Sequence, residues 1–443
     1  MKMKRSRSRW MIAAGLLAGM AVAFTLLLSR ANAKAQAEFD ARIAALEAAG
    51  EPVSIKDLAR KPPLPHDNAA TFLRRASGSI ESIDKEATAA YENLSPEDQT
   101  AVDLWRPPAS YVNALREALD AYPQALDLVD QAVNAPSYDA QLDYTADPAT
   151  FWDELEKQTL QINRRSVRLL DYRATLQLAD GDAEGALRTA LKMLKVCSHF
   201  DNDPTLLGAL VAIACRGIAL FDADQALRSG PISEPLRKQL DDELAKINLP
   251  EVYRRGLVGD RAFGLDTLRA VESGKLRATQ DDKRWLLQIA ATFAKQRSDY
   301  LDYMAKSIAL ADRPYADVID NPKLTELSAG VDPAAEVVMP SIKAAHAALC
   351  RNIAYIRGVL ILNSIQRYER DHSGQQPTLA ELGLPREVTT DPFNGQTLHV
   401  VKLPEGWSIY TVDMNLKDDG GRDFPADSGL LTNRISAKAD ARQ

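Results

Sequence analysis

The sequence predicts a mainly α-helical protein with a helix of membrane-spanning length at its N-terminus and a small α+β tail at its C-terminus. Three observations predict this. Only 6% of the residues are aromatic while 46% are hydrophobic, so a large core must be built chiefly from aliphatic side chains. Residues 10–29 contain no charge. Helical spacing of apolar residues runs over about 149–179, 183–199, 251–275, 282–311 and 334–371.

The N-terminal segment combines a basic flank with an apolar run of bilayer length. Five cations lie within residues 1–9, and residues 10–29 are uncharged. A helix over this run is about 30 Å long, which matches the hydrocarbon core of a bilayer. Since a basic flank stays on the cytoplasmic side, we expect a single-pass protein of the cytoplasmic membrane. Its N-terminus is then inside and the bulk of the chain is on the outer, periplasmic side.

Two interpretations of this segment remain open. It is either an uncleaved signal anchor or a cleaved signal peptide, for which Ala31-Asn32-Ala33 offers an A-x-A site. The uncharged run is longer than the ~7–15 apolar residues usual in signal peptides, and Arg30 interrupts the approach to the site. These features favour the anchor. Cleavage after Ala33 would instead give a secreted protein.

The charge of the chain limits its partners. Residues 1–33 hold six of the 54 basic residues and none of the 61 acidic ones, so the remainder carries a net charge of −13, against −7 for the whole chain. An acidic body of this kind disfavours nucleic acid, and no nucleic-acid partner is expected. The expected partners are the lipid bilayer, through residues 10–29, and other envelope proteins.

Composition and turn signals divide the chain into six segments. Gly50 and Pro52 stop the helix that continues from the anchor, and a proline-rich stretch follows it. The predicted segments are 1–33 (basic flank and transmembrane signal anchor), 34–66 (helix and Pro-rich linker), 67–332 (helical bundle), 333–372 (long helix joining bundle to tail), 373–430 (small α+β tail with a β-hairpin) and 431–443 (disordered end).

Helices of the bundle are predicted to begin where a capping residue precedes a proline. In each such pair a side-chain acceptor precedes a proline at the first helical position, where a backbone N–H would have no partner within the helix. The pairs are Ser95-Pro96, Asp147-Pro148 and Asp203-Pro204. The third pair opens a run over residues 205–227 that is apolar nearly all round until Asp222. This run predicts a central, buried helix.

A helical hairpin is predicted around Gly181. Asp180-Gly181-Asp182 has turn chemistry, and Ala186 and Ala190 supply small side chains that let two helices approach closely. This pattern resembles the second helix of a tetratricopeptide unit. It does not recur 34 residues before or after, so we expect one such hairpin within an irregular bundle.

The C-terminal part changes from helical to β patterning. Thr378 is predicted to cap a short helix over residues 379–382, the residues 391–395 (DPFNG) form a turn, and residues 397–402 and 407–412 form a hairpin. With the following IYTVDMNLKDDGG, this ordered set resembles the globular end of type II secretion pseudopilins, in which a DPWG turn precedes a hairpin and an Asp/Gly loop.

The resemblance covers about 65 residues and implies a shared tail fold. The N-terminal processing signature of the family is absent, so assembly into a pseudopilus is not implied. As a whole, the chain resembles uncharacterised bacterial envelope proteins of helical type.

The acidic loop after the hairpin is the candidate metal site. In the major pseudopilins this loop binds calcium, and the resemblance matches Asp418 and Asp419 to the acidic pair of the family. Calcium takes about six to eight oxygen ligands, and Gly420-Gly421 permits a tight turn. The alternative is a solvated acidic turn, and no other cofactor is expected. The candidate ligands are Asp413, Asn415, Asp418, Asp419 and Asp423.

Other reactive side chains are expected to be structural. Cys197 and His199 are two residues apart on a helix and face different directions. His346 and Cys350 share a helix face, but their surroundings are alanine-rich and lack an adjacent Asn or Asp to orient the imidazole. The basic run over residues 164–168 is expected to pair with the surplus acids.

The sequence favours a membrane-anchored envelope interaction or scaffold protein that binds through a helical groove. It contains no serine-hydrolase, zinc-protease, P-loop or dinucleotide-binding motif, and no catalytic residue is assigned. Two alternatives stay open. One is an envelope enzyme such as a hydrolase, which requires a concave pocket with converging titratable groups. The other is an accessory component of a secretion or pilus-like machine, suggested by the tail.

Overall fold

The computed structural model describes residues 33–103, 106–273, 294–322, 342–404, 406–421 and 428–430, together with Arg30 and Leu324. The predicted anchor over residues 10–29, the candidate ligand Asp423 and the end at 431–443 lie outside this described part. Within it the chain is mainly helical, as the sequence predicts, and has one small antiparallel sheet.

Most of the described chain folds into helices joined by short turns. A helix over residues 33–48 comes first, and 3₁₀ turns follow at Ile55–Leu58 and Pro65–Asp67. The strands are β1 (His399–Leu403), β2 (Gly406–Thr411) and β3 (Ser428–Leu430). The other helices are α2 (Ala69–Glu92), α3 (Pro96–Asp103), α4 (Ala109–Ala121), α5 (Pro123–Asn134), α6 (Pro148–Glu154), α7 (Gln161–Ala179), α8 (Ala183–Phe200), α9 (Leu206–Ser229), α10 (Glu234–Leu244), α11 (Leu249–Glu272), α13 (Ala294–Ala309), α14 (Tyr315–Ile319), α17 (Ile342–Asp371) and α18 (Arg386–Thr389).

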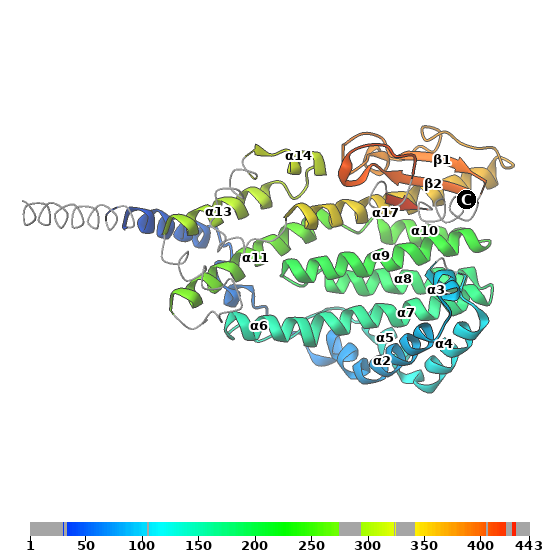
Figure 1. Cartoon of the computed structure of the whole chain (residues 1–443), viewed down its shortest axis with the longest axis horizontal. Coiled ribbons are helices and arrows are strands. Elements are labelled where there is room, and N and C mark those ends of the chain that lie inside the picture. Colours follow the sequence, from blue (N-terminus) through cyan, green and yellow to red (C-terminus); the bar gives the residue numbers. More distant parts are fainter. Residues whose placement is uncertain are drawn as a thin grey trace, which may run out of the picture.

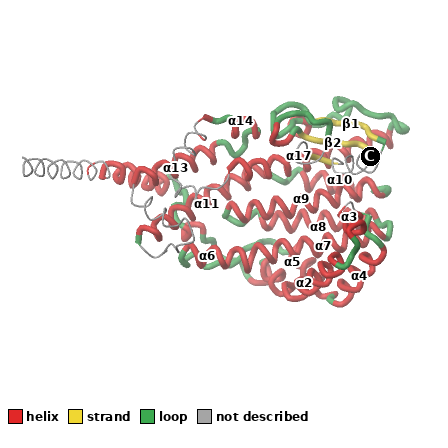
Figure 2. The backbone as a smooth tube through the Cα atoms, in the orientation of Figure 1, coloured by secondary structure: helices red, strands yellow, loops and turns green. Residues whose placement is uncertain are grey.

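The helices of the bundle lie side by side in layers (Figure 1). α2, α4 and α5 form one side of the molecule, and α7, α8 and α9 follow. α17 packs on α9, and the sheet packs on α17 at the edge of the molecule (Figure 2). α9 is therefore central, because α7, α8, α11 and α17 all contact it.

α9 is the buried apolar helix that the sequence predicts, but it begins later than predicted. Thr205, rather than Asp203, is its N-cap, because the Thr205 hydroxyl accepts a hydrogen bond from the Gly208 N–H at 2.9 Å. The Asp203 carboxylate instead accepts from the N–H and hydroxyl of Thr205, at 2.8 and 2.6 Å, and so orients the capping group.

Among the described residues, α9 is the one helix long and apolar enough to cross a membrane. Inside the fold, 67% of its most apolar stretch is buried. Burial of this kind is typical of a core helix. Most of the part of α9 that is not buried faces the cavity described in the next subsection.

α7 and α8 form the helical hairpin predicted around Gly181, which turns the chain with a φ of +78°. Asp182 caps α8 by accepting from the Gly185 N–H at 2.8 Å. Ala186 and Ala190 are fully buried, and their small side chains let α8 pack closely. The sequence does not predict one feature, a π-helical turn at Leu155–Leu160 that joins α6 to α7.

Buried hydrogen bonds connect the C-terminal sheet to the turn that precedes it. β1 and β2 form the predicted hairpin, in which Leu403 pairs with Gly406. In the predicted turn, the Asp391 carboxylate accepts from the N–H groups of Phe393 and Val412, at 2.8 and 3.1 Å, and from the Thr411 hydroxyl. The turn and the end of β2 are thereby held together.

The short helix predicted over residues 379–382 is wrong, since these residues form turns. The Thr378 N–H and hydroxyl bind the Glu381 carboxylate at 2.7 and 2.6 Å, as in a capped helix start. Gly383 then takes a φ of +62°, which ends the turn before a helix can form. The next helix, α18, begins only at Arg386.

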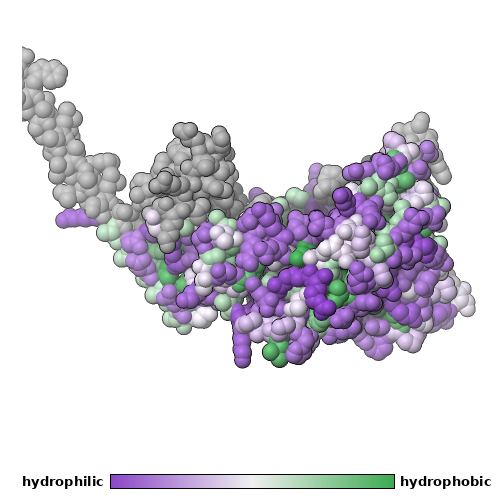
Figure 3. Space-filling model, turned by 90° about the horizontal axis from the view of Figure 1, so that it is seen from below, coloured by the Kyte–Doolittle hydropathy of each residue, from purple (hydrophilic) through white to green (hydrophobic). Residues whose placement is uncertain are grey.

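The outer surface opposite the sheet is mainly hydrophilic. Figure 3 views the molecule from below Figure 1, and on this face hydrophobic residues are scattered among hydrophilic ones. Scattered apolar residues are usual on protein surfaces. An extended apolar surface occurs instead in a cavity inside the bundle.

Candidate functional site: an apolar cavity between α9 and α17

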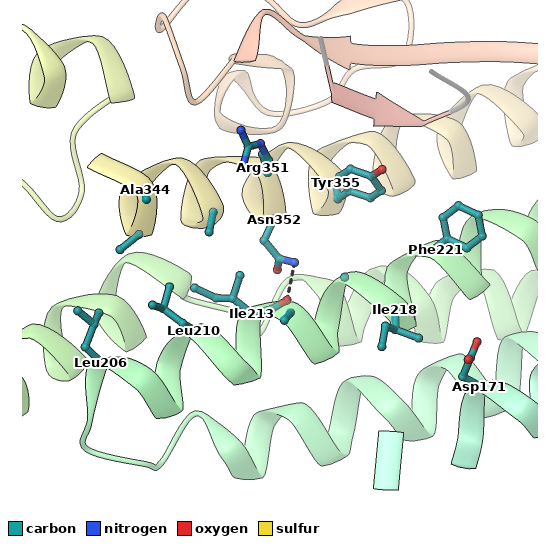
Figure 4. Close-up of a pocket in the computed structure, with 14 residues that line it drawn as sticks. Asp171, Leu206, Leu210, Ile213, Ile218, Phe221, Ala344, Arg351, Asn352 and Tyr355 are labelled. Atoms are coloured by element: carbon teal, nitrogen blue, oxygen red, sulfur yellow. Dashed lines mark hydrogen bonds between the residues drawn. The ribbon is translucent and has the colours of Figure 1, made fainter. Parts of the chain in front are cut away.

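An open cavity of about 790 Å³ lies between α9 and α17 (Figure 4). Its walls are mainly apolar, and α7 contributes one polar residue, Asp171. The volume lies within the ~300–1,000 Å³ of sites that hold small molecules. The cavity is thus a concave site of the kind that binding through a helical groove requires.

Two stripes of residues with the same spacing line this cavity. Each stripe repeats at i, i+4, i+7 and i+11, which places its members on one face of the helix. Each spans about 16 Å, because a helix rises 1.5 Å per residue. All eight residues keep some exposure, although both helices lie deep in the fold. The stripes are Leu210, Ala214, Gly217 and Phe221 on α9, and Ala344, Ala348, Arg351 and Tyr355 on α17.

The cavity stays open because several of these side chains are small. Ala214, Gly217 and Ala348 leave between the helices a space that leucines would fill. At the floor, the Asn352 side chain donates to the Ile213 carbonyl at 2.9 Å, as the dashed line in Figure 4 marks. This buried hydrogen bond fixes α17 on α9, so the helices touch at the floor and leave the stripes uncovered.

The cation that lines the cavity is already paired with the tail. Arg351 donates from Nε and Nη2 to the two carboxylate oxygens of Asp413, both at 2.8 Å. The Asp413 side chain is completely buried, with 0% exposure. A two-bond pair of this kind orients both groups, so Arg351 ties the wall of the cavity to the chain that follows β2.

The carboxyl group at the Phe221 end of the cavity has no such two-bond partner in the described chain. In Figure 4, Asp171 lies beneath Ile218 and Phe221, at the end of the cavity away from Leu206. Near it on α9 is Asp222, which is completely buried. Within the described chain, no hydrogen bond reaches Oδ1 of Asp171 or either carboxyl oxygen of Asp222.

Burial acts strongly on this carboxyl pair. It raises the pKa of Asp171 and of Asp222, and the charge of Asp171 raises the pKa of Asp222 further. Arg168, one turn away on α7, lowers the pKa of Asp171 in part, but its guanidinium donates to Asp84 at 3.0 Å. Burying a carboxyl group that has no hydrogen-bond donor destabilises a fold. Packing alone therefore does not explain why this pair is present.

This pair predicts a pH-dependent stability. Folded Asp222 keeps its proton at pH values where an unfolded Asp, with a pKa of about 3.9, has lost it. Its favourable contribution is fully present below about pH 4 and is lost as the pH rises through the raised folded pKa. Asp222→Asn cannot ionise and should melt at a higher temperature than the wild type at about pH 8, with a smaller gain at about pH 5. Thermal unfolding at the two pH values measures this, and equal gains would contradict it.

The structure distributes the predicted calcium ligands over different contacts. Asp413 faces Arg351, Asp418 accepts from the Tyr410 hydroxyl at 3.1 Å, and Asp419 accepts from the Asn415 amide at 2.6 Å. In the part of the chain that the structure describes, no group of three or more His, Cys, Asp or Glu side chains is arranged to hold a metal ion. Calcium binding by this loop remains a prediction.

The other reactive side chains serve packing. Nε2 of His346 forms a hydrogen bond with the Arg313 carbonyl at 2.8 Å. The Cys350 thiol donates to the Pro392 carbonyl at 3.5 Å. Cys197 is fully buried, and burial raises the pKa of its thiol. In the basic run, Arg168 pairs with Asp84 of α2, as expected.

Comparisons with family models, with curated proteins and with solved structures find no match for this chain. The assignment of the site therefore depends on its own geometry. The residues that form the cavity are missing from the sequence-based candidates. Two signals were present, the acidic Asp222 within an apolar helix and the small residues spaced along 344–348, but both also occur in ordinary cores.

Proposed function

We propose that this protein is a membrane-anchored envelope binding protein that holds one lipid-like amphiphile in the cavity between α9 and α17. The observation that supports this most directly is the cavity itself, with its mainly apolar walls on a central helix pair. Apolar surface left open inside a bundle lowers stability unless something covers it. An apolar ligand would bury both stripes.

The size of the cavity favours a single small molecule over a partner helix. A peptide helix about 10 Å across would fill a volume of 790 Å³ with roughly two turns. Two turns are too short for a partner helix to be stable by itself. A single extended apolar chain, in contrast, can lie along walls that are about 16 Å long.

Location in the envelope is supported by the N-terminal sequence. The basic flank and the uncharged run over residues 10–29 favour an anchor that leaves the body outside the cytoplasm. A reporter enzyme active only outside the cytoplasm, fused after Gln443, should therefore be active. Activity of a cytoplasm-only reporter at the same position would contradict this topology.

Filling the cavity tests the binding function. Ala214 is exposed in the cavity wall, so Ala214→Phe projects a ring into the space without displacing core side chains. The full chain in phosphatidylcholine nanodiscs is labelled with a photoreactive diazirine on a long-chain alcohol, and labelled peptides are identified by mass spectrometry. We expect labelling of the two stripes to fall about tenfold, which corresponds to roughly 1.4 kcal/mol of binding.

Ala214→Ser is the matched control, because it changes the same position and keeps the volume. Its labelling should equal that of the wild type. Wild-type protein that is labelled only outside α9 and α17, or equal labelling of Ala214→Phe and Ala214→Ser, would refute the proposed function.

One observation favours a second candidate, an envelope hydrolase: the two carboxyls with raised pKa at the end of a pocket. Of the two, Asp171 alone lines the cavity, whereas Asp222 is fully enclosed. The described lining contains no Ser, Thr, Cys or His that could act as a nucleophile beside Asp171. Binding is therefore the better-supported function, and hydrolysis of long-chain esters that Asp171→Asn abolishes would favour the enzyme.

A further inference from the structure

We propose that the carboxyl pair of Asp171 and Asp222 selects the head group of the ligand, so that the cavity binds long-chain amines in preference to neutral or anionic amphiphiles. This inference rests on the proposed function, and it adds the chemical class of the ligand. It follows from differences among the polar groups that line the cavity.

The polar groups along the cavity are not equivalent as binding partners. Arg351 places a cation on the wall, but the buried carboxylate of Asp413 holds it with two hydrogen bonds of 2.8 Å. An anionic head group would have to compete with that carboxylate. The Asn352 amide donates to the Ile213 carbonyl, and its own oxygen, which no described donor reaches, is an uncharged acceptor.

Asp171 is the charged group of the described lining that has unused bonding capacity. It lines the cavity, its Oδ1 is enclosed, and the described chain offers that oxygen no donor. Neither oxygen of the nearby, completely buried Asp222 has a hydrogen-bond partner in the described chain. Arg168, one turn from Asp171 on α7, acts on it only in part, because its guanidinium donates to Asp84.

An ammonium group has the chemistry that this end lacks. It brings one positive charge and three donors, which can satisfy the Asp171 carboxylate and offset its charge. A hydroxyl brings a single donor and no charge. A carboxylate brings a like charge, which an ionised Asp171 would repel. The apolar body of the ligand would then extend from Asp171 along the stripes toward Leu206 and Ala344.

A competition experiment tests this selectivity. The full chain in phosphatidylcholine nanodiscs is labelled with the diazirine alcohol, and dodecylamine, dodecanol and dodecanoate compete for the stripes on α9 and α17. We expect dodecylamine to compete at about tenfold lower concentration than dodecanol, the ratio typical of one charge-assisted hydrogen bond. Dodecanoate should compete least.

Two variants assign the preference to the pair. In Asp171→Asn the preference for the amine over the alcohol should fall to about twofold or less, while the alcohol still competes. Asp153→Asn removes one negative charge from an exposed position on α6 and is the matched control for net charge. It should keep the wild-type ratio, and so excludes a general effect of charge on amine uptake by the nanodisc.

The outcomes separate this inference from the proposed function. Equal competition by amine and alcohol in the wild type, or an unchanged ratio in Asp171→Asn, would overturn the head-group selectivity while leaving the cavity as a binding site. Absence of labelling on both stripes in the wild type would overturn the proposed function itself. If Asp171→Asn melts below the wild type, Asp222→Asn is the second variant, and it should lower the ratio in the same direction.

Discussion

Substitution of Arg351 by methionine is expected to destabilise the protein by about 3–5 kcal/mol, the usual result of breaking a buried ion pair from one side. Methionine keeps the apolar stem but removes both donors to Asp413, whose side chain is 0% exposed. The carboxylate would retain the Met414 N–H at 2.6 Å and lose its neutralising charge. Chemical denaturation followed by circular dichroism measures the loss.

Two further variants identify the cause. Arg351→Lys keeps the charge without the two-bond geometry and should lie between the wild type and Arg351→Met. Arg351→Met combined with Asp413→Asn removes both charges and should recover much of the stability lost in the single variant. A loss below about 1 kcal/mol in Arg351→Met would contradict a buried pair that fixes the tail on α17. A loss in the double variant that equals the sum of the losses in Arg351→Met and Asp413→Asn would contradict it as well.

The second large effect is expected at Gly259 of α11, which packs against the chain just before α9. A Cβ at this position would lie 1.8 Å from the Pro204 carbonyl oxygen and 2.8 Å from its carbon. Both are backbone atoms, so Gly259→Ala must displace either α11 or the start of α9. We expect a loss of about 3 kcal/mol or more, at the upper end of overpacking effects.

Gly78→Ala in α2 is the matched control, because it is also a glycine within a helix but has open space around it. It should be neutral or stabilise by about 0.5–1 kcal/mol, since alanine restricts the unfolded chain more than glycine does. Thermal unfolding compares the two. Similar melting temperatures for both variants would show that α11 and α9 are not packed as closely as described.

Much of the helical framework follows from local sequence signals. The structure contains the helix start predicted at Asp147-Pro148, the turn predicted at Gly181 and the buried helix predicted from the apolar run of α9. Each of these depends on the residues themselves and little on their neighbours. Errors occur where two local signals compete. Thr205 caps α9 in place of Asp203, and Gly383 prevents the helix predicted after Thr378.

The cavity could not be predicted in the same way, because it depends on which helices meet. α9 and α17 are separated by more than a hundred residues. Nothing in the sequence of either stripe indicates that it packs beside the other. Asp171 lies in a segment that also holds several arginines, a composition typical of an exposed helix face, and in the fold α9 encloses it. Asp413 lies among acidic residues in the sequence, which therefore predicts it as a calcium ligand. In the fold it instead accepts hydrogen bonds from Arg351, which is distant in the sequence.

The most direct test of ligand binding between α9 and α17 is a crystal structure of the full chain grown from bicelles with dodecylamine that carries bromine on its terminal carbon. The anomalous signal of bromine is expected at the end of the cavity formed by Leu206 and Ala344, which places the amine at Asp171. Bromine beside Asp171 would reverse the orientation and contradict the role of the carboxyl pair. A cavity without bromine, in crystals that bind it elsewhere, would contradict the account as a whole.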